Sequence, residues 1–140
     1  MTRGTTARTW VLCATGILIS ISSAILFVLS LGERVPEEFG TVGAHLLEVA
    51  VSVCILLLGT VIAVRQPRNP IGWLLVAAAL AFSVGAFCGA YALRGLITAP
   101  GSLPGSDVAG WASQWTWPVG FTAIPLVLLL FPDGRPLSRG

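Results

Sequence analysis

Hydrophobic residues are concentrated in four long runs, at residues 10–31, 42–64, 71–93 and 111–131, with short polar segments between them. A transmembrane helix needs about 20 mostly apolar residues to cross roughly 30 Å of hydrocarbon, and each run is about that long. None of the runs alternates apolar and polar residues as the strands of a membrane β-barrel do. The pattern predicts an all-α integral membrane four-helix bundle.

The segments between the runs predict one membrane domain, residues 1–140, whose spans are joined by short loops. The predicted tails and loops are residues 1–9, 32–41, 65–70, 94–110 and 132–140. In the 65–70 link, Asn69 can cap the third helix, and Pro70 fits its first position, where a missing N–H costs nothing. Pro118 and Pro125 fall inside the fourth run, so we expect a kink in that helix.

The composition excludes several classes of protein. Charged residues make up only 10% of the chain, whereas an average soluble domain has roughly 25%. So few charges cannot cover the surface of a small water-soluble domain. A net charge of +2 is also too small to form a phosphate-binding surface, so we expect the lipid bilayer and not a nucleic acid as a partner.

The eight arginines predict how the spans are oriented. With alternating spans, Arg34 and Arg94 lie on one side and the other six on the opposite side. Those six are Arg3, Arg8, Arg65, Arg68, Arg135 and Arg139. Because cytoplasmic segments are enriched in basic residues, we expect a multi-pass plasma-membrane protein with both termini in the cytoplasm.

A cleavable signal peptide is the alternative interpretation of the first run. Its apolar core is longer than the usual core of about 7–15 residues, and no small-residue cleavage site follows it, so an uncleaved span is expected.

Tryptophans and arginines at the ends of the spans predict anchors at the two membrane surfaces. Trp10 and Trp73 mark the inner interface, whereas Trp111 and Trp115, with Trp117, mark the outer one. Anionic headgroups at the inner surface are the expected contacts of Arg65, Arg68 and Arg135.

A polar pair interrupts the second run. His45 and Glu48 lie three residues apart and therefore on one helix face. An ionisable group inside hydrocarbon costs at least about 2.5–3.5 kcal/mol, so this face should point into the bundle. Helix register places Tyr91 nearby. The residues His45, Glu48 and Tyr91 form either a proton- or ligand-responsive pocket or, alternatively, a contact that only pins the second helix to its neighbours.

Small residues predict where the helices pack most closely. Gly16, Ser20, Ser23 and Ser30 form one stripe of the first helix, and Gly85 and Gly89 form a G-x-x-x-G pattern in the third. We favour packing within one chain over a homodimer, which this pattern also allows.

Candidate chemistry is sparse. The cysteines Cys13, Cys54 and Cys88 lie in three different runs without metal-ligand spacing, and there is one histidine, so no metal or other cofactor is expected. The sequence also has no phosphate-binding glycine loop, nucleophile elbow or metalloprotease motif, so it predicts no catalytic residue and no enzyme.

Motifs in the second half of the chain are specific enough to compare with a family. Residues 65–75 read R-Q-P-R-N-P-I-G-W-L-L, residues 91–96 Y-A-L-R-G-L, and residues 130–135 L-F-P-D-G-R. In order and spacing they resemble the N-terminal membrane-spanning input region of sensor histidine kinases from high-GC Gram-positive bacteria. The resemblance covers about residues 42–140.

This resemblance implies an input region that is truncated before the kinase domains. In the family, the F-P-D-G-R turn leads into further membrane helices, a phosphorylated histidine and an ATP-binding domain. Because His45 lies within a span, none of the phosphotransfer residues is carried over to this chain.

The sequence therefore favours a multi-pass signal-transduction module without catalytic activity, related to two-component systems. A kinase or another membrane protein is then an expected partner. The alternative is a stand-alone assembly or interaction subunit. A small transporter is a weaker third reading, because inverted repeats and multiple facing polar groups are missing from the sequence.

Overall fold

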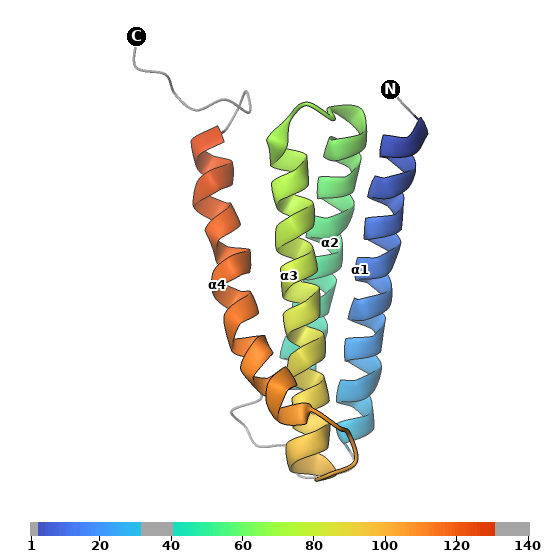
Figure 1. Cartoon of the computed structure of the whole chain (residues 1–140), viewed down its shortest axis with the longest axis vertical. Helices are drawn as coiled ribbons and strands as arrows, with labels where there is room; N and C mark the ends of the chain where they lie inside the picture. The colour runs from blue at the N-terminus through green and yellow to red at the C-terminus, as the bar shows by residue number, and fades with distance from the viewer. Residues whose placement is uncertain (1–2, 32–40, 131–140) are drawn as a thin grey trace.

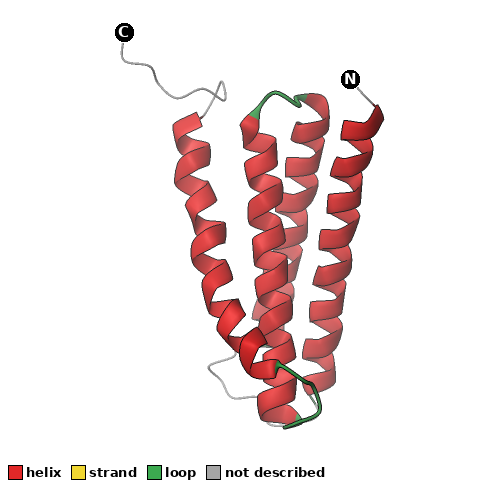
Figure 2. Ribbon diagram, viewed as in Figure 1, coloured by secondary structure: helices red, strands yellow, loops and turns green. Residues whose placement is uncertain are grey.

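The computed structural model describes residues 3–31 and 41–130, and these form an all-α four-helix bundle (Figures 1 and 2). The helices are α1 (Arg3–Ser30), α2 (Val42–Arg65), α3 (Pro70–Ala92) and α4 (Ser106–Leu130), with a six-residue π-helix, η2 (Leu93–Thr98), continuing α3. All four α-helices are long and apolar enough to cross a membrane. The predicted fold class is confirmed.

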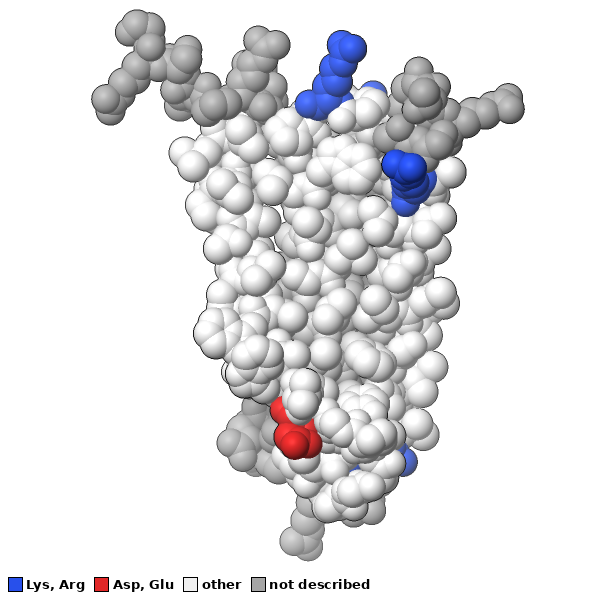
Figure 3. All heavy atoms as spheres, viewed as in Figure 1, with Lys and Arg blue, Asp and Glu red and all other residues white. Residues whose placement is uncertain are grey.

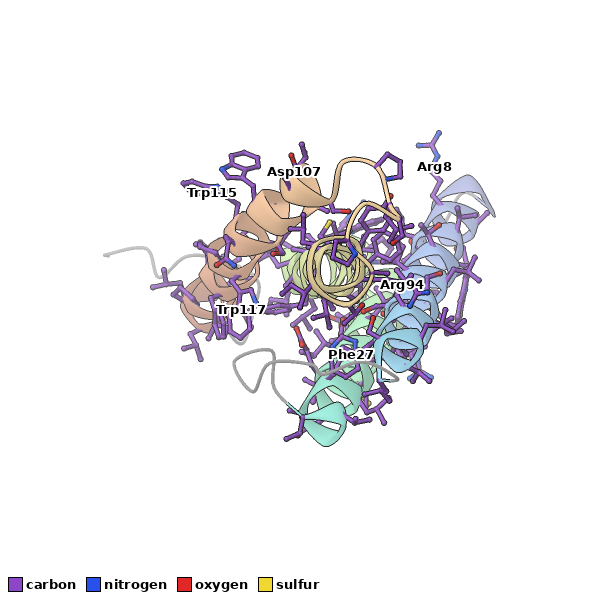
Figure 4. The ribbon with its side chains drawn as sticks, turned by 90° about the horizontal axis from the view of Figure 1, so that it is seen from below. Arg8, Phe27, Arg94, Asp107, Trp115 and Trp117 are labelled. Atoms are coloured by element: carbon purple, nitrogen blue, oxygen red, sulfur yellow. The ribbon has the colours of Figure 1, made fainter. Side chains whose placement is uncertain are left out.

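The helices run up and down in sequence order, with α3 at the centre. Viewed along the bundle, α1, α2 and α4 surround α3 (Figure 4). The link between α2 and α3 lies at the same end as the start of α1 and the end of α4, and η2 lies at the opposite end (Figure 1). In the space-filling view, most of the arginine atoms lie at the upper end, acidic atoms and a few arginine atoms lie near the lower end, and the face between them is uncharged (Figure 3).

The link between α2 and α3 is built as the sequence predicts. Asn69 is the N-cap of α3, its side-chain oxygen accepts a hydrogen bond of 3.0 Å from the Ile71 N–H, and Pro70 is the first helical residue. At the start of α2, the Thr41 hydroxyl accepts a bond from the Ala44 N–H. These caps satisfy backbone donors that have no partner within the helix.

The predicted outer loop at residues 94–110 is too long. Helical structure continues to Thr98 in η2 and resumes at Ser106, which leaves residues 99–105 as the connection. Leu93 and Thr98 are buried, so packing extends the third helix past the point where composition suggests a loop. Gly101 and Gly105 have φ values of 77° and 70°, which favour glycine and make the turn back into α4.

Two apolar clusters hold the first three helices together. Cys13, Leu56, Val76 and Ala79 form one cluster among α1, α2 and α3. The other, nearer η2, contains Phe27, Ala90 and Leu93. The serine stripe of α1 is buried as predicted, with Ser20, Ser23 and Ser30 at most 1% exposed.

Glycines set the closest helix contacts. A Cβ added at Gly72 would lie 2.6 Å from the Ala63 backbone nitrogen, and one at Gly59 would lie 2.8 Å from that of Val76, so α2 and α3 touch backbone to backbone. In the G-x-x-x-G pattern, Gly85 packs against Thr116 of α4, whereas the space beside Gly89 is open to 4 Å. One glycine of the pattern therefore closes an interface and the other borders a space.

The fourth helix packs mainly against α3 and η2. It contains both Pro118 and Pro125 and stays helical through them. A proline has no N–H to donate to the carbonyl four residues earlier, so α4 lacks two internal hydrogen bonds. The helix curves along the side of α3 (Figure 1).

Candidate functional site: an intramembrane polar cleft

A cleft of about 410 Å³ opens between α2 and α4, with α3 as its floor. Each of the four α-helices and η2 contributes to its wall. The lining residues are Phe27, His45, Glu48, Gly85, Ala86, Gly89, Ala90, Leu93, Ser113, Gln114 and Trp117. Small residues on α3 leave the room that the cleft occupies, and the polar groups come from α2 and α4.

His45 is held in place by α1. Its Nε2 atom lies 3.1 Å from the Ser23 hydroxyl, and its ring stacks on Phe27 with centroids 4.2 Å apart. Only 9% of the residue is exposed. When Ser23 donates to Nε2, the proton of the neutral ring is on Nδ1, which is the nitrogen that faces Glu48.

Glu48 has fewer partners. Its Oε2 lies 3.9 Å from His45 Nδ1, which is too far for a hydrogen bond, and 37% of its side chain is exposed. Over residues 3–31 and 41–130, no hydrogen bond to its carboxylate is formed. The expected shared face of His45 and Glu48 is present, and it leaves one carboxylate facing the cleft.

Tyr91 does not line this cleft. Its hydroxyl donates a 3.0 Å hydrogen bond to the Pro104 carbonyl, and its ring contacts Phe87. It lies two residues after Gly89, which turns it roughly 200° around the helix from that cleft-lining position. The hypothesis that Tyr91 joins His45 and Glu48 is therefore corrected: it secures the 99–105 connection.

Arg94, one turn beyond Tyr91, also acts at the end of the bundle. Its Nη1 donates a 2.9 Å hydrogen bond to the Leu29 carbonyl in the last turn of α1. A cation at a helix C-terminus satisfies a free carbonyl and interacts favourably with the helix dipole.

The polar groups opposite His45 and Glu48 come from α4, and sequence reasoning did not assign them. They are Ser113 and Gln114, with Trp117 one turn further on. Gln114 is the only amide in the fourth apolar run, and that signal could have identified it. In Figure 4, Trp117 lies on the inner side of α4, whereas Trp115 points outward.

A second polar feature lies deeper among the first three helices. The Ser20 hydroxyl donates to Ser83 at 3.0 Å, Ser83 and Ser52 are 2.9 Å apart, and Ser52 donates to the Ala79 carbonyl at 3.1 Å. Each hydroxyl has one proton, so an order in which Ser20 donates to Ser83, Ser83 to Ser52 and Ser52 to Ala79 gives every donor an acceptor. This chain of hydroxyls links α1, α2 and α3, and in this order it has no proton left to donate to a ligand.

A second cavity of about 400 Å³ adjoins the cleft and is almost entirely apolar. Its lining residues are Ala44, Leu47, Glu48, Val51, Ser52, Ile55, Phe82, Trp117, Phe121 and Ile124. Glu48 and Trp117 line both cavities, so the two form one groove along the space between α2 and α4.

Of the expected interface anchors, Trp10 and Trp73 lie near the end of the bundle that carries the α2–α3 link, and Trp111 and Trp115 lie in the first half of α4. Trp10, Trp111 and Trp115 are 50–65% exposed, and Trp73 follows the cap of α3. Arg65 and Arg68 flank the link between α2 and α3, and Arg135 lies outside the described residues. Among residues 3–31 and 41–130, no cluster of three or more His, Cys, Asp or Glu side chains could hold a metal ion.

Comparison of the chain with family models, with curated proteins and with solved structures gives no match. The length and hydropathy of its helices therefore carry the classification: this is a multi-pass membrane protein with four helical spans.

Proposed function

We propose that this chain is the sensory input module of a two-component system, inserted with both termini in the cytoplasm. A cue in the outer leaflet or outside the cell shifts the packing of its helices, and their cytoplasmic ends relay the shift to a histidine kinase domain in the same or another chain. The chain itself carries no catalytic step. The arginine distribution and the motifs at residues 65–75, 91–96 and 130–135 support this assignment.

The observation that carries the proposal is the composition of the cleft wall. Phe27 comes from α1, His45 and Glu48 from α2, Gly89 from α3 and Gln114 from α4. A molecule that fills this cleft contacts every α-helix. A ligand shifts a conformational equilibrium only when it binds one state better than the other, and a site shared by four helices meets this condition when they move.

The test joins the 140-residue chain to the dimerisation and catalytic domains of a reporter histidine kinase. Autophosphorylation is then measured in membranes for the wild-type fusion and for Glu48→Gln. We expect the variant to differ by at least about fivefold, the lower end of ordinary allosteric coupling. Asp107→Asn is the matched control, because Asp107 is the other described carboxylate and lines neither cavity. Equal autophosphorylation of wild type and Glu48→Gln across pH and lipid composition would remove the sensory role.

The orientation has its own test. Alkaline phosphatase fused after Gly140 should be inactive and a cytoplasmic reporter at the same position active. The opposite pattern would exclude the topology with both termini in the cytoplasm.

A stand-alone assembly subunit is the second candidate, and the low burial of α4 favours it. Large apolar side chains on this helix, including Val108, Val119 and Leu128, are more than 60% exposed. A partner membrane protein could cover this face. Photocrosslinking from position 119 to one defined membrane protein, together with a kinase fusion that does not respond, would support this candidate over the sensory one.

A further inference from the structure

The groove between α2 and α4 changes from polar to apolar along its length. The cleft near η2 contains His45, Glu48, Ser113 and Gln114. The adjoining apolar cavity begins at the same level of α2, at Ala44 and Leu47, and extends towards the middle of the bundle. Its deeper lining consists of Val51, Ser52 and Ile55 of α2, Phe82 of α3, and Phe121 and Ile124 of α4. On α4 the lining changes in this direction from Ser113 and Gln114 to Phe121 and Ile124, whereas α3 contributes only small or apolar residues to both cavities. The groove therefore matches a molecule with a polar head and a hydrocarbon tail, lying along the bundle with its head towards η2.

The polar end of the groove favours a positively charged head. Glu48 faces both cavities without a hydrogen bond from the described residues, and none of the described arginines lines either cavity. A carboxylate at this depth needs a counter-charge or a donor. A negatively charged head would instead be repelled by the Glu48 carboxylate.

The other polar groups fit an ammonium head as well. Ser113 donates its proton to the Gly110 carbonyl at 2.8 Å, so its oxygen is left to act as an acceptor. The Gln114 side chain adds an amide oxygen. Trp117 lines both cavities, as Glu48 does, and the face of an indole ring attracts a cation. His45 contributes less, because its Nε2 is already paired with Ser23.

We propose that the groove binds one bilayer lipid with an ammonium headgroup, of the phosphatidylethanolamine class. Its ammonium contacts Glu48 and Trp117, and one acyl chain lies in the apolar cavity. This deepens the proposed function by naming the ligand class of the same cleft. Zwitterionic amine lipids are supplied by the membrane itself. A lipid between α2 and α4 gives α4 two packing states, one with the lipid bound and one without it.

The experiment reconstitutes the full chain into vesicles that contain a photoreactive phosphatidylethanolamine or a photoreactive phosphatidylglycerol with the same diazirine acyl chain. After illumination, the labelled residues are located by mass spectrometry. We expect the amine lipid to label Leu47, Val51, Phe121 and Ile124 about tenfold more than the anionic lipid does. Glu48→Gln should reduce amine-lipid labelling to the level of the anionic lipid, and Asp107→Asn should leave it unchanged.

A second pair of variants keeps the test decisive if Glu48→Gln does not fold. Trp117→Leu should also lower labelling in the groove, whereas Trp115→Leu should not, because Trp115 points away from it (Figure 4). Helical content by circular dichroism is recorded for each variant, so that a loss of labelling is compared among folded proteins.

Three results would overturn the proposal. These are equal labelling by the two lipids, labelling that is indifferent to both Glu48 and Trp117, and crosslinks between two copies of the chain through the groove with lipid excluded. The last result would make a second chain the occupant. The labelling experiment involves no kinase domain, so it is independent of the kinase-fusion test. Selective lipid labelling together with an unresponsive kinase fusion would refute only the sensory role. A responsive kinase fusion without selective lipid labelling would refute only the lipid site.

Discussion

The first three helices and the fourth helix are assembled in different ways. Within the apolar 18-residue stretch of each span, 28–39% is buried inside the bundle for α1, α2 and α3, whereas only 11% is buried for α4. The three helices share the Ser20–Ser83–Ser52 chain and backbone contacts at Gly59 and Gly72. The fourth helix rests on α3 alone along most of its length.

This difference explains why the molecule has a groove. In a membrane the hydrophobic effect does not drive helices together, so small residues and interhelical hydrogen bonds decide which ones pack closely. These features join α1, α2 and α3. At α4, Gly85 and Gly120 allow contact with α3, but no comparable feature joins α4 to α2. The space left between α2 and α4 contains Glu48 and Trp117.

The strongest way to break the three-helix core is at Gly72. In Gly72→Leu the new Cβ would meet the Ala63 backbone, which cannot rotate away as a side chain can. We expect a loss of about 3 kcal/mol or more in the free energy of unfolding, the upper range for overpacking. Thermal unfolding in detergent measures it. Gly89→Ala is the control, since its Cβ meets nothing within 4 Å; equal effects of the two changes would contradict the backbone contact.

Breaking the buried hydroxyl chain should cost less. Ser83→Val leaves the Ser20 hydroxyl without its acceptor, while Ser52 keeps its bond to the Ala79 carbonyl, so we expect a loss of about 1–2 kcal/mol in the free energy of unfolding. Ser22→Val is the comparison, because Ser22 is exposed and bonds only to Leu18 of its own helix. If both variants unfold at the same temperature, the chain of buried hydroxyls does not hold the three helices together.

The attachment of α4 is tested at Gly85. In Gly85→Ala the Cβ would meet the Thr116 side chain, which can move together with its helix. We therefore expect α4 to shift away from α3, at a cost of about 1 kcal/mol, with the first three helices intact. Spin labels on α3 and α4 should report an increased separation, whereas labels on α1 and α3 should not. An increase in both distances would show that α4 is part of one rigid unit.

The smallest expected effect is a gain in stability. Thr60 is fully buried in α2, and its hydroxyl has no hydrogen-bond partner among the described residues. Thr60→Val removes that unpaired group at nearly constant size, so we expect stabilisation of about 0.5–1 kcal/mol. Thr15→Val, which removes an exposed hydroxyl bonded to Val11, should give no gain. A destabilised Thr60→Val would indicate that the hydroxyl has a partner in the protein.

Local patterns in the sequence predicted much of this molecule. Residues at most a few positions apart determine the helices α2 and α3, the Asn69–Pro70 cap, and the shared face of His45 and Glu48. The same local reasoning failed for Tyr91, because which residue of α3 faces α2 depends on how the helix is turned in the bundle. It also missed Gln114, whose partners lie on another helix.

The amino-acid sequence by itself determined that this chain consists of four apolar helices of membrane-spanning length, because hydropathy, capping and helix period are properties of short segments. Only the tertiary structure decided that α3 is central, that Gly85 packs against α4 while Gly89 does not, and that Glu48 and Trp117 line the same groove. Those outcomes depend on the rotation of each helix about its axis. That rotation is set by interlocking surfaces from distant parts of the chain.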